Sequence, residues 1–235
     1  MSRRQILFLT GCALILLCSG GWNYYQIQGY HQEIETLQME KQILQQQSNA
    51  REHIYNQSLD KAELHLDYET WPHYFDAAEA MVKDSEGNFE RPWAIFLVKE
   101  AEPYDIDPFL VYELLKVETG NTFKQDLVGP ETEYGHAYGM AQFMKNTAPW
   151  LAEKANIPYE QDLLFNPYYS MKLSLVYLDF LYNQYGNWNE ALTAYHRGMT
   201  GLQEYKEENG NAKSEYAVKI QRQAEKYQDF VAYLP

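Results

Sequence analysis

The chain has 235 residues, 46% of them hydrophobic, which is enough for one globular domain of roughly 100–200 residues and an accessory segment. It carries 19 basic and 33 acidic residues, a formal net charge of −14. Such a polyanion repels nucleic-acid phosphates and anionic lipid surfaces, so we expect no nucleic-acid partner.

The first residues have the features of a membrane-targeting segment. Arg3 and Arg4 precede an apolar run at residues 6–18, and aromatic residues begin at Trp22. A basic flank, an apolar stretch and an aromatic belt are typical of an uncleaved signal anchor with its arginines in the cytoplasm. We therefore predict a single-pass transmembrane segment at residues 1–22, with everything after it outside the cytoplasm.

Two other fates of this segment stay open. Cys18 and Gly20 are small residues at the spacing that a signal peptidase needs, which allows cleavage after Gly20. Residues 9–12 resemble a lipoprotein box that ends at Cys12. Each of the three outcomes exports the rest of the chain.

A helical stalk is expected at residues 23–70. Apolar positions repeat there at alternating steps of three and four from Ile27 to Leu44, with an interruption at Lys41. Two interpretations remain open: a weak parallel coiled coil through which the chain self-associates, or a single amphipathic helix that rests on the globular domain.

Residues 71–235 carry helix start and stop signals and no useful alternating run of β-branched residues. An N-cap side chain followed by a first-turn proline occurs at Asp107 and again at Asn166. We therefore predict an all-α domain over 71–235. Helices are expected at 109–119, 168–185 and 188–195, ended by glycines 120, 186 and 198.

Glu118 is the most informative residue of this domain. It follows Val111, Leu114 and Leu115 by seven, four and three positions, so it shares their apolar face of the helix. A carboxyl group at the edge of a core loses hydration, which raises its pKa toward the value that a general acid needs near neutral pH. Periodicity alone favours a glutamate at the helix end that bends out to solvent.

A series of short motifs around and after Glu118 carries a family resemblance. They occupy residues 117–120, 138–143, 146–148, 162–167 and 191–198. In this order they resemble the catalytic domain of the soluble lytic transglycosylases and goose-type lysozymes, whose pattern runs Glu-Ser, Gly-Leu-Met-Gln, Thr-Ala, Asp-Pro and Ala-Tyr-Asn-x-Gly. With a matching lead-in at 104–108 and a late Tyr-Ala-Val at 216–218, the resemblance covers roughly residues 90–222.

The resemblance implies a lysozyme-like helical catalytic domain with a sugar-binding groove for peptidoglycan. Glu118 would protonate the glycosidic oxygen, and Tyr195 would hydrogen-bond at the catalytic end of the groove. The residues that would contact the substrate are Thr119, Tyr138, Met140, Gln142, Phe143 and His196. Without the resemblance, Met140, Phe143 and Tyr195 would be interpreted as core residues.

Two positions depart from the family pattern. Thr119 replaces a serine and keeps its hydroxyl group. His196 replaces an asparagine, so an amide gives way to a ring that can be cationic.

The implied reaction uses one carboxyl group. Glu118 would act first as an acid and then as a base toward the 6-hydroxyl of N-acetylmuramic acid (MurNAc), which attacks its own anomeric carbon. This cleaves the β-1,4 bond between MurNAc and N-acetylglucosamine (GlcNAc) and leaves a 1,6-anhydroMurNAc end. Ordinary glycosidases use two carboxylates, so a water-using muramidase with Glu133 or Asp126 as the second one stays open.

A non-catalytic cell-wall-binding module is a further alternative. The sequence holds no zinc-binding or phosphate-binding motif, so we expect no cofactor and no metal. The expected partners are peptidoglycan glycan strands and, through the N-terminal segment, the cell membrane. The catalytic domain would then face the cell wall.

Overall fold

The computed structural model describes residues 71–231 and six earlier positions, 34, 37, 38, 41, 45 and 49, which are helical and exposed. The predicted membrane segment at 1–22 and most of the predicted stalk at 23–70 lie outside the described residues, so both stay predictions. Within the part that is described, no helix combines the length and the apolar character that a membrane span requires.

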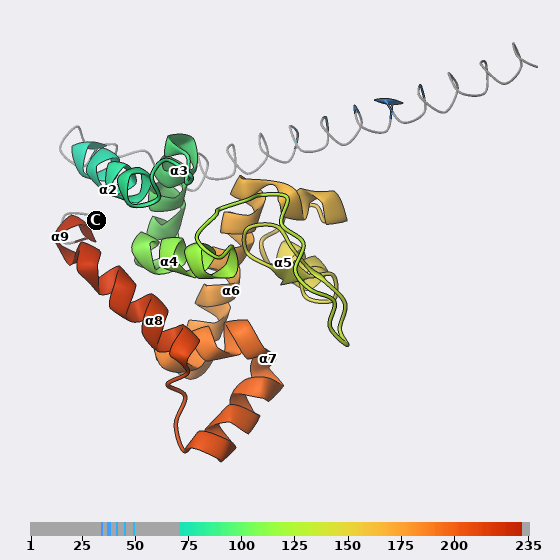
Figure 1. Cartoon of the computed structure of the whole chain (residues 1–235), viewed down its shortest axis with the longest axis vertical. Helices are drawn as coiled ribbons and strands as arrows, with labels where there is room; N and C mark the ends of the chain where they lie inside the picture. The colour runs from blue at the N-terminus through green and yellow to red at the C-terminus, as the bar shows by residue number, and fades with distance from the viewer. Residues whose placement is uncertain are drawn as a thin grey trace, which may run out of the picture. The chain divides into compact units, whose positions relative to one another are not determined.

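Residues 71–231 are mostly helical, which confirms the predicted character of the domain (Figure 1). The helices are α2 (Trp71–Asp84), α3 (Arg91–Ala101), α4 (Pro108–Glu118), α5 (Ala148–Lys154), α6 (Pro167–Tyr185), α7 (Trp188–Asn209), α8 (Glu215–Ala224) and α9 (Gln228–Val231). Three short 3₁₀ helices join them: η1 (Glu102–Tyr104), η2 (Gln161–Phe165) and η3 (Glu225–Tyr227).

The all-α prediction needs one correction, because a small antiparallel sheet follows α4. Strand β1 (Ala137–Tyr138) pairs with β2 (Phe143–Met144). The chain reverses between them through Gly139 and Gln142, both with positive φ, at 73° and 50°. Strands of two residues are too short to leave an alternating pattern in the sequence.

The predicted N-caps form as expected. The Asp107 side chain accepts a hydrogen bond from the backbone N–H of Phe109 at 2.8 Å. Asn166 Oδ1 accepts from the backbone N–H groups of Tyr168 and Tyr169 at 3.0 and 3.3 Å. These bonds satisfy donors that the first turn of a helix leaves unpaired, which explains why α4 and α6 begin where they do.

Helix α7 is longer than the sequence indicated. Gly198 has φ 74° and ψ 166°, so it breaks the helix as predicted. The chain then resumes helical conformation and continues to Asn209. The break matters for the site, because it lies directly after Tyr195 and His196.

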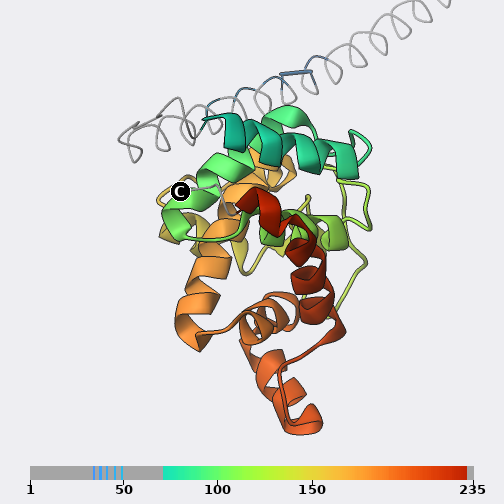
Figure 2. The same cartoon turned by 90° about the vertical axis from the view of Figure 1, so that its left-hand side faces the viewer.

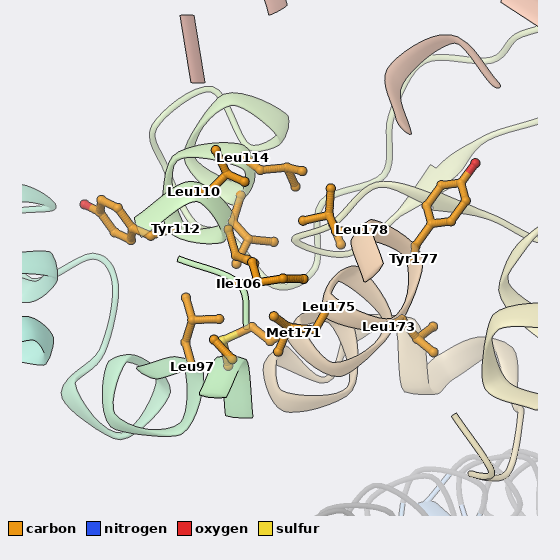
Figure 3. Packing of buried hydrophobic residues seen from close by; sticks show 14 of the residues in the cluster. Leu97, Ile106, Leu110, Tyr112, Leu114, Met171, Leu173, Leu175, Tyr177 and Leu178 are labelled. Carbon is orange, nitrogen blue, oxygen red and sulfur yellow. The ribbon is translucent and has the colours of Figure 1, made fainter. Parts of the chain in front are cut away.

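Helix α4 lies in the hydrophobic core and packs against α3, α6 and α8. Figure 3 shows side chains of α4 and α6 meeting in the core, among them Leu114 and Leu178, which are fully buried. Well-packed interiors leave side chains little freedom to move. The last turn of α4 is therefore held on a rigid support.

Helix α8 connects two regions of the domain. It contacts α7 near its start and lies along α4, and α9, which follows it, contacts α2 (Figures 1 and 2). This path brings the first turn of α8 to the last turn of α4, where Glu118 lies.

Candidate active site

Glu118 is the last residue of α4 and is half-buried. Val111, Leu114 and Leu115, which share its helix face, are fully buried, as the periodicity predicted. The Oη of Tyr216, in the first turn of α8, donates a hydrogen bond of 2.5 Å to Glu118 Oε1. The carboxyl group is thus fixed between the core and a single phenol donor.

The surroundings of Glu118 set its protonation. Burial raises its pKa to about 7, and the hydrogen bond from Tyr216 opposes this rise in part. Burial and the nearby carboxylate raise the pKa of Tyr216 well above its ordinary value, so the phenol keeps its proton. Near neutral pH the Glu118 carboxyl can therefore both give and take a proton.

Glu118 lines a cavity of about 1040 Å³. The other lining residues belong to the segment 130–147, to α6 through Tyr177, and to residues 195–204 of α7. Small-molecule sites usually measure about 300–1,000 Å³, so this cavity has room for more than one sugar ring.

Four of the residues predicted to act with Glu118 line the same cavity: Gln142, Phe143, Tyr195 and His196. Tyr195 Oη donates to the Ala141 carbonyl at 3.1 Å and lies 3.2 Å from Ser174 Oγ. Burial raises its pKa well above the ordinary value. Tyr195 therefore joins α7 to the β1–β2 turn while its ring faces the cavity.

The β1–β2 turn requires its glycine. A Cβ on Gly139 would lie 1.8 Å from the Leu164 carbonyl oxygen of η2, and φ is 73° there. Gln142 Nε2 donates to the Gly139 carbonyl at 2.8 Å, which holds the turn closed. The close approach explains in physical terms why glycine begins the Gly-Met-Ala-Gln segment.

Three predicted contact residues do not line the cavity. Met140 is fully buried, Thr119 is 3% exposed and Tyr138 is 9% exposed. Thr119 Oγ1 donates to the Leu115 carbonyl and accepts from the backbone N–H of Phe123, so its hydroxyl ends α4. All three side chains are buried, and the predicted contact of each with the substrate stays a prediction.

His196 packs on the donor to Glu118. Its ring stacks on the Tyr216 ring, with centroids 4.5 Å apart and planes 8° from parallel. Burial of the imidazole and the charge of Arg197 lower the His196 pKa, so the ring is neutral near pH 7. His196, which stands where the family pattern has asparagine, thus packs on the phenol that binds Glu118.

The three acidic residues of the loop after α4 differ in whether they line the cavity. Glu133 is exposed and lines the cavity. Asp126 and Glu131 are exposed and do not line it. Among residues 71–231 and the six earlier positions, no group of three His, Cys, Asp or Glu side chains could hold a metal ion.

Sequence reasoning missed the role of Tyr216. The Tyr-Ala-Val segment at 216–218 matched the family series, but nothing in the local pattern linked it to Glu118, 98 residues earlier. Arg197, Asn146 and Thr147 also line the cavity without having been singled out as site residues.

Comparison with known proteins identifies the family of the domain. The family model described as Transglycosylase SLT domain matches residues 96–218, about half of the chain. Among solved structures, an inactive mutant of the lytic transglycosylase Slt from Pseudomonas aeruginosa aligns over 68% of this chain and 30% of its own, with a TM-score of 0.50 and 18% identity.

The soluble lytic transglycosylase SLT70 from Escherichia coli aligns over 71% of this chain and 28% of its own, with a TM-score of 0.43 and 18% identity. This chain therefore spans less than a third of the length of either relative. No curated protein sequence matches it.

Proposed function

Because the chain belongs to the transglycosylase SLT domain family, we propose that it is a peptidoglycan lytic transglycosylase with Glu118 as general acid and base. The observation that carries the proposal is the state of Glu118. Its carboxyl group lines the cavity, is bound by one phenol donor and has a pKa of about 7. A general acid works best when its pKa lies near the working pH.

The reaction cleaves the MurNAc–GlcNAc β-1,4 bond in two proton transfers. Neutral Glu118 gives its proton to the glycosidic oxygen while the bond from that oxygen to the MurNAc anomeric carbon breaks. The MurNAc 6-hydroxyl oxygen then bonds to the anomeric carbon, and its proton passes to the Glu118 carboxylate. The products are a 1,6-anhydroMurNAc end and a free GlcNAc 4-hydroxyl, and Glu118 is neutral again.

The neighbouring residues act on this carboxyl group and on the sugar. Tyr216 stabilises the Glu118 carboxylate after it has given its proton, because its hydrogen bond is to the charged form. Gln142, Phe143 and His196 line the cavity and are the expected contacts for the sugar on either side of the cleaved bond.

A second candidate is a water-using muramidase, favoured by Glu133, the loop acid that lines the cavity. Inverting glycosidases use a second carboxylate of this kind to activate water. The two candidates differ in their products, because hydrolysis leaves a reducing MurNAc end and transglycosylation leaves an anhydro end that is lighter by one water.

Product analysis with matched variants tests the proposal. Wild-type protein incubated with peptidoglycan should release anhydro ends, identified by mass before and after borohydride reduction. Glu118→Gln should abolish release while the fold and glycan binding persist, whereas Glu133→Gln should leave it intact. Reducing ends that disappear with Glu133→Gln would establish the muramidase, and undiminished cleavage by Glu118→Gln would refute the assigned role.

We also propose that the domain faces the cell wall from the membrane. The support is the basic and apolar composition of residues 1–22, followed by the heptad-like segment at 23–70. A tether raises the local concentration of an enzyme whose net charge of −14 gives it no attraction to an anionic wall. Protease digestion of intact spheroplasts tests this location, since only an outward-facing domain would be cut.

A further inference from the structure

A half-exposed tryptophan lies next to the cavity and takes no part in the proposed chemistry. Trp150, on α5, is 38% exposed. Thr147, the N-cap of α5, lines the cavity together with Asn146. Residues three apart share one face of a helix, so Trp150 continues the face on which Thr147 meets the cavity.

Ring contacts connect Trp150 to the catalytic end of the cavity. Its ring centroid lies 6.2 Å from that of Tyr177, which lines the cavity, and the rings are perpendicular, at 88°. Tyr177 in turn lies 5.2 Å from Tyr195. Figure 3 shows the Tyr177 ring pointing away from the other labelled core residues. Aromatic side chains thus form a continuous series from Tyr195 to Trp150.

The indole is held in place from α6. Its centroid lies 4.9 Å from that of Phe180, at an interplanar angle of 81°, in addition to the contact with Tyr177. Two perpendicular ring contacts fix the orientation of a side chain that remains partly exposed. A preorganised aromatic surface costs little conformational entropy when it binds a ligand.

We propose that Trp150 forms an outer subsite of the groove and stacks on a further pyranose ring of the same glycan strand. This subsite rests on the proposed function. Trp150 does not itself line the cavity, but its ring packs on Tyr177, which does. A glycan strand that leaves the cavity beside Tyr177 is therefore the ligand for which this position is placed. A pyranose has apolar C–H faces for the indole and hydroxyl groups within reach of polar side chains such as Asn146 and Thr147.

One side chain competes for the indole. Lys154, one turn further along α5, has its Nζ 5.6 Å from the Trp150 ring centroid. Lys154 is exposed, and cation–π contacts at exposed sites are weak. A sugar ring can therefore displace the ammonium group, which stays solvated at the edge of the subsite.

Binding to strands of two lengths tests the outer subsite. The full chain with Glu118→Gln is titrated calorimetrically with peptide-free glycan strands, a tetrasaccharide and an octasaccharide. Adding Trp150→Ala should weaken octasaccharide binding by about 3–10-fold, the value of one aromatic contact, and leave tetrasaccharide binding unchanged. Trp150→Phe should recover most of the loss, because a ring remains.

Trp71→Ala provides the matched control. Trp71, on α2, is 37% exposed and makes perpendicular contacts with Tyr74 and Phe75, neither of which lines the cavity. Trp71→Ala should leave the affinities for the tetrasaccharide and the octasaccharide unchanged. The outer subsite is refuted if Trp150→Ala spares octasaccharide binding, weakens both strands equally or acts no differently from Trp71→Ala.

The failure of this inference is distinguishable from failure of the proposed function. If wild-type protein cleaves peptidoglycan but Trp150→Ala gives any of the refuting results, the outer subsite alone is wrong. If wild-type protein cleaves nothing and Glu118→Gln binds neither strand, the proposed function fails and the subsite fails with it.

Discussion

Replacing Tyr216 with phenylalanine removes one hydroxyl group, the one that donates to Glu118 Oε1 at 2.5 Å. The ring that stacks on His196 remains, so the packing around the site is preserved. A hydrogen bond to a carboxylate stabilises its charged form. Without that bond the pKa of Glu118 should rise above its value of about 7.

The size of the rise follows from the strength of the bond. Hydrogen bonds to charged groups contribute about 1.5–3 kcal/mol, and one pKa unit corresponds to about 1.36 kcal/mol. The pKa of Glu118 should therefore increase by about 1–2, to roughly 8–9. The maximal rate should also fall, by about 10-fold, because the carboxylate left after proton transfer loses its stabilising partner.

The assay is the pH dependence of kcat/KM for glycan release from peptidoglycan. In wild-type protein activity should fall as pH rises through about 7, where Glu118 loses its proton. In Tyr216→Phe this alkaline limb should move to higher pH. Tyr182→Phe is the control, because Tyr182 packs on Trp188 and does not line the cavity. An alkaline limb that stays at the wild-type pH or moves to lower pH would refute the assigned role of the Tyr216 hydrogen bond.

Three further predictions concern stability. Folding raises the pKa of Glu118 from 4.5 to about 7, so the wild-type protein loses stability as pH rises through that range. Glu118→Gln avoids this loss. It should therefore raise the free energy of unfolding by up to about 3 kcal/mol above pH 7 and hardly at all below pH 4.5. Urea unfolding at acid and alkaline pH checks this, and equal differences at both would contradict it. Gly139→Ala should lower the free energy of unfolding by about 2–5 kcal/mol, because the new Cβ would overlap a backbone carbonyl of η2 and the positive φ would be strained. Gly87→Ala is the control: its φ is 85° but the space around it is open, so it should lose only the part due to strain. Lys172→Met should lower the free energy of unfolding by about 3–5 kcal/mol, because it leaves Glu100 charged and unpaired in the core. The double variant Lys172→Met/Glu100→Met should lose less, and urea unfolding of both variants would show the difference.

The helix starts were predictable from sequence because their signals are local. A side chain at Asp107 or Asn166 binds backbone groups two or three residues away, so the same few residues both encode and form the cap. The glycine that ends α6, Gly186, acts in the same local way through its φ of 72°. The small sheet escaped prediction because two-residue strands depend on the turn between them and not on periodicity.

The site was predictable only in part. Glu118, Gln142 and Tyr195 reach the cavity that the motif series implied, whereas Met140 and Thr119 point into the core. The motif series identifies which segments gather at a site. It does not tell which side chain of a segment faces the cavity, since that depends on how the turn at Gly139 packs against η2.

What the sequence determined by itself is therefore the helical class, the caps and the face of α4 on which Glu118 lies, since each depends on neighbours within one or two turns. The packing of α8 against α4 decided the hydrogen-bond partner and the hydration of Glu118. It brings Tyr216 to Glu118 across 98 residues of chain and withdraws the carboxyl from water. Hydration is lost only when distant segments close around a group, so the raised pKa of Glu118 is a property of the folded domain.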